Sequence, residues 1–232
     1  MLRQQFFHTE SATMQVANES HSNRENPVWV LHGFGATKIW VRPLALRLHE
    51  YGWQASTYGY QAFVGTIQAR AEQLVSDIQK HYQATHQPLY LIGHSMGGIV
   101  ARIAADRVGP DIVQKLVLIC SPSQGSHVAG RVEKVVGFFF PMVAQMSDRR
   151  DSFVRKLPSP KIPCAIIAAD HDLVVKPEST KIEGVEQWMM VPGMHSAAPW
   201  RKDVAEAIDR FLRTNSLSDN VVNGVAADHQ RT

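Results

Sequence analysis

The feature that most limits the fold of this chain is a series of short apolar runs that alternate with segments of helical period. The apolar runs lie at residues 28–32, 54–60, 89–93, 115–120, 164–169 and 187–191. The helical segments lie at residues 38–51, 66–84, 96–108 and 199–213. This alternation is typical of a parallel sheet, and strands without a polar face belong to a sheet covered on both sides. We therefore predict an α/β fold with a mostly parallel central sheet and helices on both faces.

The length of 232 residues fits one such domain, which we place at residues 27–213. Residues 1–26 form a polar N-terminal segment, and residues 214–232 lack any period and are predicted to be a flexible C-terminal tail. One insertion, between the fourth and fifth strands, is longer than a simple crossover needs. Because it contains the apolar stretch VVGFFFPMVAQM, we predict a small helical cap at about residues 127–160.

Charge and hydropathy exclude several classes of partner. The 24 basic and 21 acidic residues are spread along the chain without a basic block, so we expect no nucleic-acid partner. The longest uncharged apolar segment, at residues 135–146, is too short to span a bilayer, and the N-terminus shows no signal peptide. We expect no stable membrane insertion, a cytoplasmic location, and neither a metal nor an organic cofactor. The oligomeric state stays open.

A serine stands between glycines where an apolar strand meets a helical segment, in the stretch GHSMGG at residues 93–98. A strand that turns directly into a helix strains its central residue, and glycine fits nearby because larger side chains would collide. Such a turn exposes the hydroxyl above the sheet edge and puts the next amide at a helix N-terminus. The context favours Ser95 as a nucleophile over an ordinary glycine turn.

A serine nucleophile needs a base, a group that orients the base, and donors for an oxyanion. The loop HGFG at residues 32–35 follows the first strand, and in a parallel sheet it leaves the same carboxyl edge as Ser95. We therefore predict that the main-chain N–H groups of Phe34 and Met96 point at one oxygen. A plain tight turn is the alternative for this loop.

The candidates for the base are the histidines on loops that follow predicted strands, namely His127, His171 and His195. The other histidines fall in polar termini, on or next to helical surfaces, or beside the serine and the first loop. His195 lies between the last strand and the last helix, so its loop leaves the carboxyl edge of the sheet. We predict His195 as the general base, with His127 and His171 as alternatives.

The orienting acid is expected on another loop of the same edge. The stretch AADHDLVV offers Asp170 and Asp172, and Asp172 lies further past the end of the strand, where its side chain can reach across. Asp170 can instead cap the turn. Asp172 is therefore the predicted acid, which gives the order serine, aspartate, histidine along the chain.

The stretches HGFGAT, GHSMGGIVAR, CSPSQGSHVAG, AADHDLVV and VPGMHS together resemble the α/β-hydrolase superfamily and its lipase/esterase-like branch. The resemblance runs from about residue 27 to residue 212 and implies the α/β-hydrolase fold. It also implies these roles: nucleophile Ser95, acid Asp172, base His195, and oxyanion donors Phe34 and Met96.

Particular stretches of the resemblance bear on the substrate. SPSQGSHVA looks like the segment after the sixth strand in bacterial lipases, which favours esters, whereas dehalogenase-like members carry aspartate at the serine position. The acid loop of the family usually reads Gly-x-x-Asp-x-x-Val. Here Ala169 replaces the glycine, while Asp172 and Val175 keep the spacing. Many relatives have a longer cap, so the compact insertion predicts a pocket open to modest acyl groups.

The resemblance therefore implies a carboxylesterase or lipase-like enzyme that cleaves carboxylic esters through an acyl-enzyme intermediate. The expected substrate is a small-molecule ester with an apolar acyl group. Packing for stability alone is the alternative explanation of the apolar segment in the insertion. The predicted walls of the acyl pocket come from that segment and are Phe138, Phe139, Phe140 and Met142.

Other functions stay open at this point. A thioesterase, amidase or acyltransferase would use the same triad and differ only in pocket and leaving group. A non-catalytic binding protein on the same fold is a further alternative. So is a structural partner protein that exposes GFFFPMV as an interaction surface.

Overall fold

In the computed structural model, which describes residues 26–129, 141–149 and 152–218, six parallel strands form one sheet in the order β2-β1-β3-β4-β5-β6. Each strand overlaps one of the predicted apolar runs, and the prediction of an α/β fold is confirmed. The strands are β1 (Pro27–Leu31), β2 (Gln54–Tyr58), β3 (Leu89–His94), β4 (Val113–Ile119), β5 (Cys164–Ala169) and β6 (Gln187–Val191).

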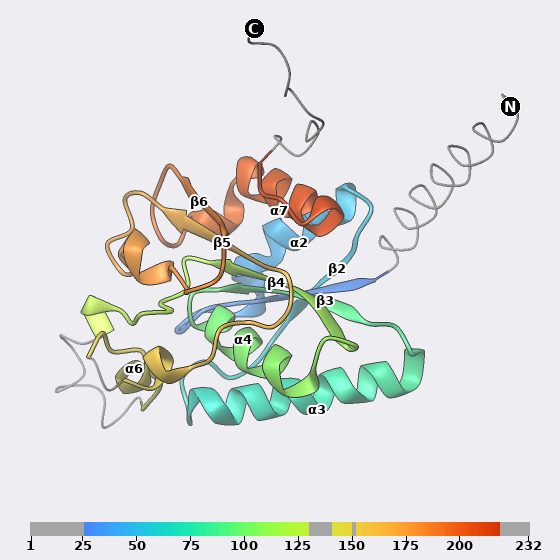
Figure 1. Cartoon of the computed structure of the whole chain (residues 1–232), viewed down its shortest axis with the longest axis horizontal. Helices are drawn as coiled ribbons and strands as arrows, with labels where there is room; N and C mark the ends of the chain where they lie inside the picture. The colour runs from blue at the N-terminus through green and yellow to red at the C-terminus, as the bar shows by residue number, and fades with distance from the viewer. Residues whose placement is uncertain (1–25, 130–140, 150–151, 219–232) are drawn as a thin grey trace, which may run out of the picture.

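Helices cover both faces of the sheet, α2 and α7 on one side and α3 and α4 on the other (Figure 1). None of the helices in the described ranges is long and apolar enough to cross a membrane. The long helices are α2 (Arg42–Glu50), α3 (Ile67–Thr85), α4 (Met96–Val108) and α7 (Lys202–Thr214). Short helices are η2 (Lys38–Val41), η4 (Pro177–Thr180) and η5 (Ala198–Trp200).

Strand β3 shows why the central strands carry no polar face. Leu89 and Leu91 are fully buried in the core beneath α3 and α4, whereas Tyr90 and Ile92 are fully buried in the core beneath α2 and α7. Side chains of a strand point alternately to the two faces, so a strand between two helical layers must be apolar at every position.

The connection after β1 creates the crevice in which the candidate site lies. Strand β1 pairs with β2 on one side and with β3 on the other, so the chain reverses its direction of travel across the sheet at this point. The loops that follow β1 and β3 therefore lead to opposite sides of the sheet. Ligands of open α/β sheets bind at such a switch point, outside the carboxyl ends of the strands.

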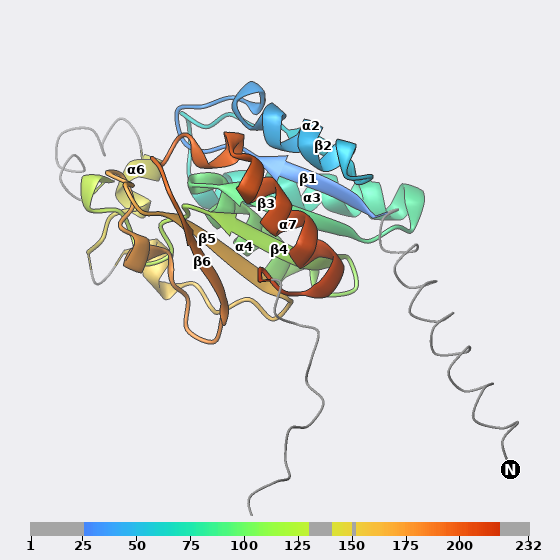
Figure 2. The same cartoon turned by 90° about the horizontal axis from the view of Figure 1, so that it is seen from above.

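The insertion between β4 and β5 lies at one end of the sheet in both views (Figures 1 and 2) and contains α6 (Pro141–Gln145) and η3 (Phe153–Lys156). Ser126 holds its first part in two places: the Ser126 amide donates to the Met146 carbonyl, just after α6, at 2.7 Å, and the Ser126 hydroxyl donates to the Val174 carbonyl, on the loop after β5, at 2.6 Å. Its return is held by the buried Arg102 guanidinium, which donates to the carbonyl oxygens of Leu157 and Pro158.

The C-terminal boundary differs in part from the predicted tail. Helix α7 ends at Thr214, but Leu217 is buried, and its amide donates to the Gln187 side chain at 2.8 Å. A single leucine in a polar stretch has no periodicity, so the sequence pattern could not reveal this packing. Residues 219–232, like the predicted N-terminal segment up to residue 25, lie outside the described residues.

Candidate active site

Ser95 joins β3 to α4, and its backbone is left-handed, with φ of 55° and ψ of −125°. This conformation costs a residue other than glycine about 1–3 kcal/mol, so the surrounding structure must hold it. The Ser95 amide donates to the Ile119 carbonyl at 2.8 Å, and the Ser95 carbonyl accepts the Ser121 hydroxyl at 2.9 Å. These two bonds tie the turn to the end of β4.

Glycine is required around Ser95 because other segments approach it closely. A Cβ added to Gly93 would overlap the main chain of Gly98 at the start of α4. A Cβ added to Gly33, on the loop after β1, would lie only 2.9 Å from the Ser95 Cβ. The loop after β1 and the serine turn are therefore in direct contact, as their positions in the sequence predict.

The two predicted oxyanion donors lie on either side of this contact. Met96 is the first residue of α4, where amide N–H groups have no acceptor within the helix. Phe34 follows Gly33 and lines a cavity together with Ser95. The structure thus brings the residues Phe34, Ser95 and Met96 together, and binding of an oxyanion by their amides stays a prediction.

His195 and Asp172 form a buried pair, with His195 Nδ1 2.6 Å from Asp172 Oδ2. The Asp172 side chain is 1% exposed and the His195 side chain 11%. Because the carboxylate can only accept, Nδ1 carries the proton, and Nε2 of the neutral ring keeps its lone pair. The pair therefore has the tautomer that a general base requires.

The loop after β5 fixes the Asp172 carboxylate. Its Oδ1 accepts the amides of Val174 at 2.8 Å and Val175 at 2.7 Å. Burial opposes ionisation, but the hydrogen bond and charge of His195 and the two amides outweigh it, so the pKa of Asp172 lies below its ordinary value. The carboxylate is ionised and held in one orientation.

The alternatives that the sequence left open lie elsewhere. Asp170 accepts the Gly193 amide at 2.8 Å and contacts the exposed His171 ring at 2.5 Å, so it joins the loops after β5 and β6. His127 is half-buried in the first turn of the insertion. Among the described residues, the hydrogen bond to Asp172 Oδ2 belongs to His195.

Ser95 and His195 line one cavity of about 330 Å³, here called the serine cavity. Its walls come from the loop after β1, the insertion and the acid loop, with Phe34, Val143 and Val174 among them. The cavity brings a hydroxyl on a strained turn and an oriented imidazole to one shared space.

A comparison of the chain with protein families finds a match that includes most of the loops of this cavity. Residues 58–208 match the family described as the PGAP1-like alpha/beta domain. The chain belongs to the PGAP1-like alpha/beta domain family. The match includes the serine turn, the acid loop and the base loop, and it leaves β1 and the loop after it outside.

This PGAP1-like domain also has lipases among its relatives. Stretches of 133 and 130 residues are 28% and 27% identical to triacylglycerol lipases of Burkholderia plantarii and Pseudarthrobacter phenanthrenivorans. They cover 52% and 51% of this chain but 36% and 40% of those lipases. The chain thus spans less than half the length of these curated relatives.

Solved structures show the same fold. The mature form of a Bacillus licheniformis lipase superposes with a TM-score of 0.69 at 12% identity, over 83% of this chain and 93% of that one. A monoacylglycerol lipase of Paleococcus ferrophilus superposes with a TM-score of 0.59 at 18% identity, over 82% and 95%. Together with the family match, these neighbours confirm the predicted lipase/esterase-like α/β-hydrolase.

The predicted acyl-pocket residues of this PGAP1-like domain are only partly described. Phe138, Phe139 and Phe140 lie outside the described residues. Met142 is fully buried in the core beneath α3 and α4 and is not one of the described side chains that line the serine cavity. Val143 and Met146 line it instead. Helical period predicts which residues share a face, but the direction of that face depends on how the insertion folds back.

Two histidines hold the site in ways that the sequence did not predict. His94 is buried, its Nε2–H donates to the His195 carbonyl at 3.0 Å, and burial lowers its pKa to about 3. His32 stacks on Tyr60, which donates its hydroxyl proton to the His32 carbonyl at 2.6 Å. His94 thus fixes the base loop, and His32 fixes the loop after β1 to the end of β2. In the sequence, each of these two histidines stands as a polar residue at the end of an otherwise apolar strand, and this position was the signal that could have pointed to its role.

A metal is not needed to explain the polar groups of the PGAP1-like site. Among the described residues, the ligand atoms of Cys120, Asp172 and His195 lie within 4.8 Å of one another. Asp172 bonds both His195 and the Cys120 thiol, and burial together with the Asp172 carboxylate raises the pKa of that thiol, which keeps it protonated. A neutral thiol is a poor metal ligand, so we assign no metal to this cluster.

Proposed function

We propose that this domain is a serine hydrolase that cleaves carboxylic esters through an acyl-enzyme. The observation that carries the proposal is the 2.6 Å bond between His195 Nδ1 and the ionised Asp172, beside a cavity that Ser95 also lines. A base whose second ring nitrogen is not used by the carboxylate, and a hydroxyl on a strained turn that lines the same cavity, are what acyl transfer to serine requires.

The reaction follows from these positions. His195 Nε2 takes the Ser95 proton as Oγ bonds to the ester carbonyl carbon, and the amides of Phe34 and Met96 stabilise the oxyanion. The bond from carbon to the alcohol oxygen then breaks, and the alcohol leaves with the proton from Nε2. Water repeats the sequence on the acyl-enzyme and releases the carboxylic acid. Asp172 holds the ring and stabilises its charged form.

The apolar walls of the serine cavity support an apolar acyl group. Phe34, Val128, Val143 and Met146 line it, and its volume of about 330 Å³ fits a short to medium chain. The curated relatives are triacylglycerol lipases, whose name agrees with this substrate class. We therefore expect ester hydrolysis to exceed thioester and amide hydrolysis, which the same triad could perform.

The test replaces the nucleophile. Ser95→Ala should remove labelling by a fluorophosphonate probe and lower kcat for p-nitrophenyl butyrate by about 10³-fold or more, with unchanged thermal unfolding. Ser76→Ala, on the exposed face of α3, is the matched control and should keep both activities. Near-parental hydrolysis by Ser95→Ala would refute the proposal. An unlabelled, inactive parent protein would favour a binding role.

A further inference from the structure

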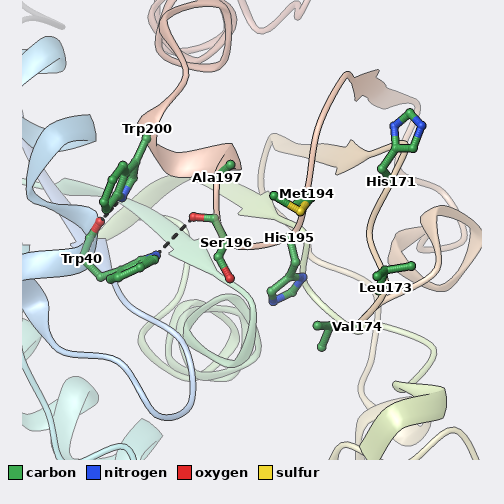
Figure 3. A pocket seen from close by; sticks show the side chains of 9 residues that line it. All are labelled: Trp40, His171, Leu173, Val174, Met194, His195, Ser196, Ala197 and Trp200. Atoms are coloured by element: carbon green, nitrogen blue, oxygen red, sulfur yellow. Dashed lines mark hydrogen bonds between the residues drawn. The ribbon is translucent and has the colours of Figure 1, made fainter.

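A second cavity of about 330 Å³ adjoins the serine cavity on the far side of His195. We call it the tryptophan cleft, after Trp40 and Trp200, which form one wall (Figure 3). Leu173 and Val174 lie on the opposite side, and the His195 ring stands between the two walls (Figure 3). The acid loop, the base loop and the loop after β1 therefore all contribute to it.

Large apolar side chains of this cleft are exposed to solvent. Leu173 is 79% exposed, Met194 63%, Trp200 47% and Trp40 39%. Single exposed apolar residues are common on protein surfaces, but a group of them around a hollow marks a ligand-binding groove. The lining side chains that can ionise are two histidines, His195 and the exposed His171, so the described walls offer a ligand mainly apolar surface.

The tryptophan wall is held in place before any ligand binds. The Trp200 indole N–H donates to the Trp40 carbonyl at 2.7 Å, and the Trp40 indole N–H donates to the Ser196 carbonyl at 3.2 Å (Figure 3). The centroids of the Trp40 and Trp200 rings lie 4.9 Å apart. Because both N–H groups are used inside the protein, the rings turn only carbon surface toward the cleft. The wall is also bonded directly to the loop that carries His195.

The chemistry of acyl transfer decides which part of a substrate can enter this cleft. The acyl group is bonded to the Ser95 oxygen, so its chamber must include Ser95, as the serine cavity does. The alcohol oxygen must lie beside His195 Nε2, which protonates it. The described lining of the tryptophan cleft includes His195 but not Ser95. The cleft can therefore hold the alcohol part of an ester. Trp40 also lines a smaller cavity together with Ser95 and His195, so among the described side chains Trp200, Met194 and Leu173 are the walls that belong to the cleft alone.

We infer that the tryptophan cleft binds the alcohol group of the substrate and selects esters of neutral alcohols that carry a large apolar or aromatic group. The inference rests on the proposed serine mechanism. Under this inference, two cavities select two parts of the ester. The serine cavity selects the acyl chain, and the tryptophan cleft, with walls made by Trp40, Trp200, Met194 and Leu173, selects the leaving alcohol.

The test keeps the acyl group constant and varies the alcohol. Release of butyric acid from methyl, hexyl and benzyl butyrate is followed by pH titration, so that every substrate gives the same acyl-enzyme. In Trp200→Ala, kcat/KM for benzyl and hexyl butyrate should fall about ten-fold or more, the usual value of a lost apolar contact of this size. Methyl butyrate, which does not reach the tryptophan wall, should change less than about two-fold.

Matched variants separate binding from support of the base loop. Trp200→Phe loses the bond to the Trp40 carbonyl but keeps an aromatic face, so it should retain the preference for benzyl butyrate. Met194→Ala should weaken the preference, whereas Met190→Ala, at another exposed methionine outside the cleft, should not. An equal fall for all three esters would mean that Trp200 only supports the His195 loop, and would overturn the inference.

A direct binding measurement separates this inference from the serine mechanism. Benzyl alcohol is titrated into Ser95→Ala, and the indole N–H signals are followed by NMR, with Trp200→Phe used for assignment. Shifts of the Trp40 and Trp200 signals support the cleft as a binding site even if no ester is hydrolysed. Unchanged signals at millimolar benzyl alcohol, or stronger shifts with choline than with benzyl alcohol, would overturn the choice of a neutral apolar alcohol.

Discussion

Replacement of Asp172 by asparagine tests the geometry of the site most directly. Asparagine has the shape of aspartate, but one of its two polar ends is an N–H donor. In the native structure Oδ1 accepts two amides, from Val174 and Val175, and Oδ2 accepts the ring proton of His195. The new side chain must turn its NH₂ group toward one of these two sets of donors.

The hydrogen-bond count decides the orientation. An NH₂ group facing the loop would oppose two buried amides, each of which would lose an acceptor at a cost of about 1–3 kcal/mol. An NH₂ group facing His195 conflicts with the ring proton, and the ring can resolve this by moving that proton to Nε2. The Cys120 thiol also bonds Asp172, but a thiol is a weaker donor than a backbone amide. We therefore expect Asp172→Asn to fold normally and to hold His195 with Nε2 protonated.

A ring in this tautomer cannot take the proton of Ser95. Loss of the correct tautomer in a Ser-His-Asp triad lowers kcat by about 10⁴-fold, equivalent to about 5.5 kcal/mol of activation free energy. The assay is the rate of hydrolysis of p-nitrophenyl butyrate, combined with the midpoint of urea unfolding. We expect a loss of this size in kcat and a change in unfolding free energy below about 2 kcal/mol.

Asp170→Asn is the matched control, because Asp170 lies two residues earlier and contacts His171 and the Gly193 amide instead. Its rate should change by less than about five-fold, as expected for a partly exposed surface pair. If Asp172→Asn kept near-parental activity, or if Asp170→Asn lost more activity than it, the assignment of the orienting acid would be refuted.

Three further outcomes test the structure around the site. Gly98→Ala should lower the free energy of unfolding by about 1–3 kcal/mol, because the new Cβ would overlap the Ser121 hydroxyl, and an unchanged urea midpoint would contradict this. Burial lowers the pKa of Lys115 to about 8 from an ordinary 10.5, so the unfolded chain binds more protons at this side chain between these values, and the contribution of Lys115 to stability rises with pH there, by at most about 1.4 kcal/mol per unit. In urea unfolding measured from pH 7 to 10.5, the difference in unfolding free energy between the parent and Lys115→Met should therefore shift in favour of the parent as the pH rises, and a difference independent of pH would contradict this. Cys120 is fully buried with a raised thiol pKa, so iodoacetamide should label it only after unfolding, and rapid labelling of the native protein in mass spectra would disprove its burial.

The sequence by itself determined the sheet and the edge at which the site forms. Apolar runs such as LYLIG can only be buried on both faces, and the glycines around Ser95 reflect steric exclusion between adjacent segments. The strand pattern and the contact of Gly93 with Gly98 are local, because they depend on the backbone and on neighbours close in the chain, whereas Gly98 also meets the more distant Ser121. The local signals therefore predicted the six strands and the strained serine turn without any knowledge of tertiary contacts.

Only the tertiary structure decided which side chains meet across loops. The sequence favoured Asp172 over Asp170 only by its greater distance from the strand end, whereas its contact with His195 follows from the path of the loop after β5, which turns Asp172 toward that ring. The contact of His94 with the His195 carbonyl joins residues 101 positions apart. The division of the site into a serine cavity and a tryptophan cleft likewise depends on where His195 stands between loops from distant parts of the chain. Periodicity carries no information about such long-range approaches, because they arise from packing after the elements have formed.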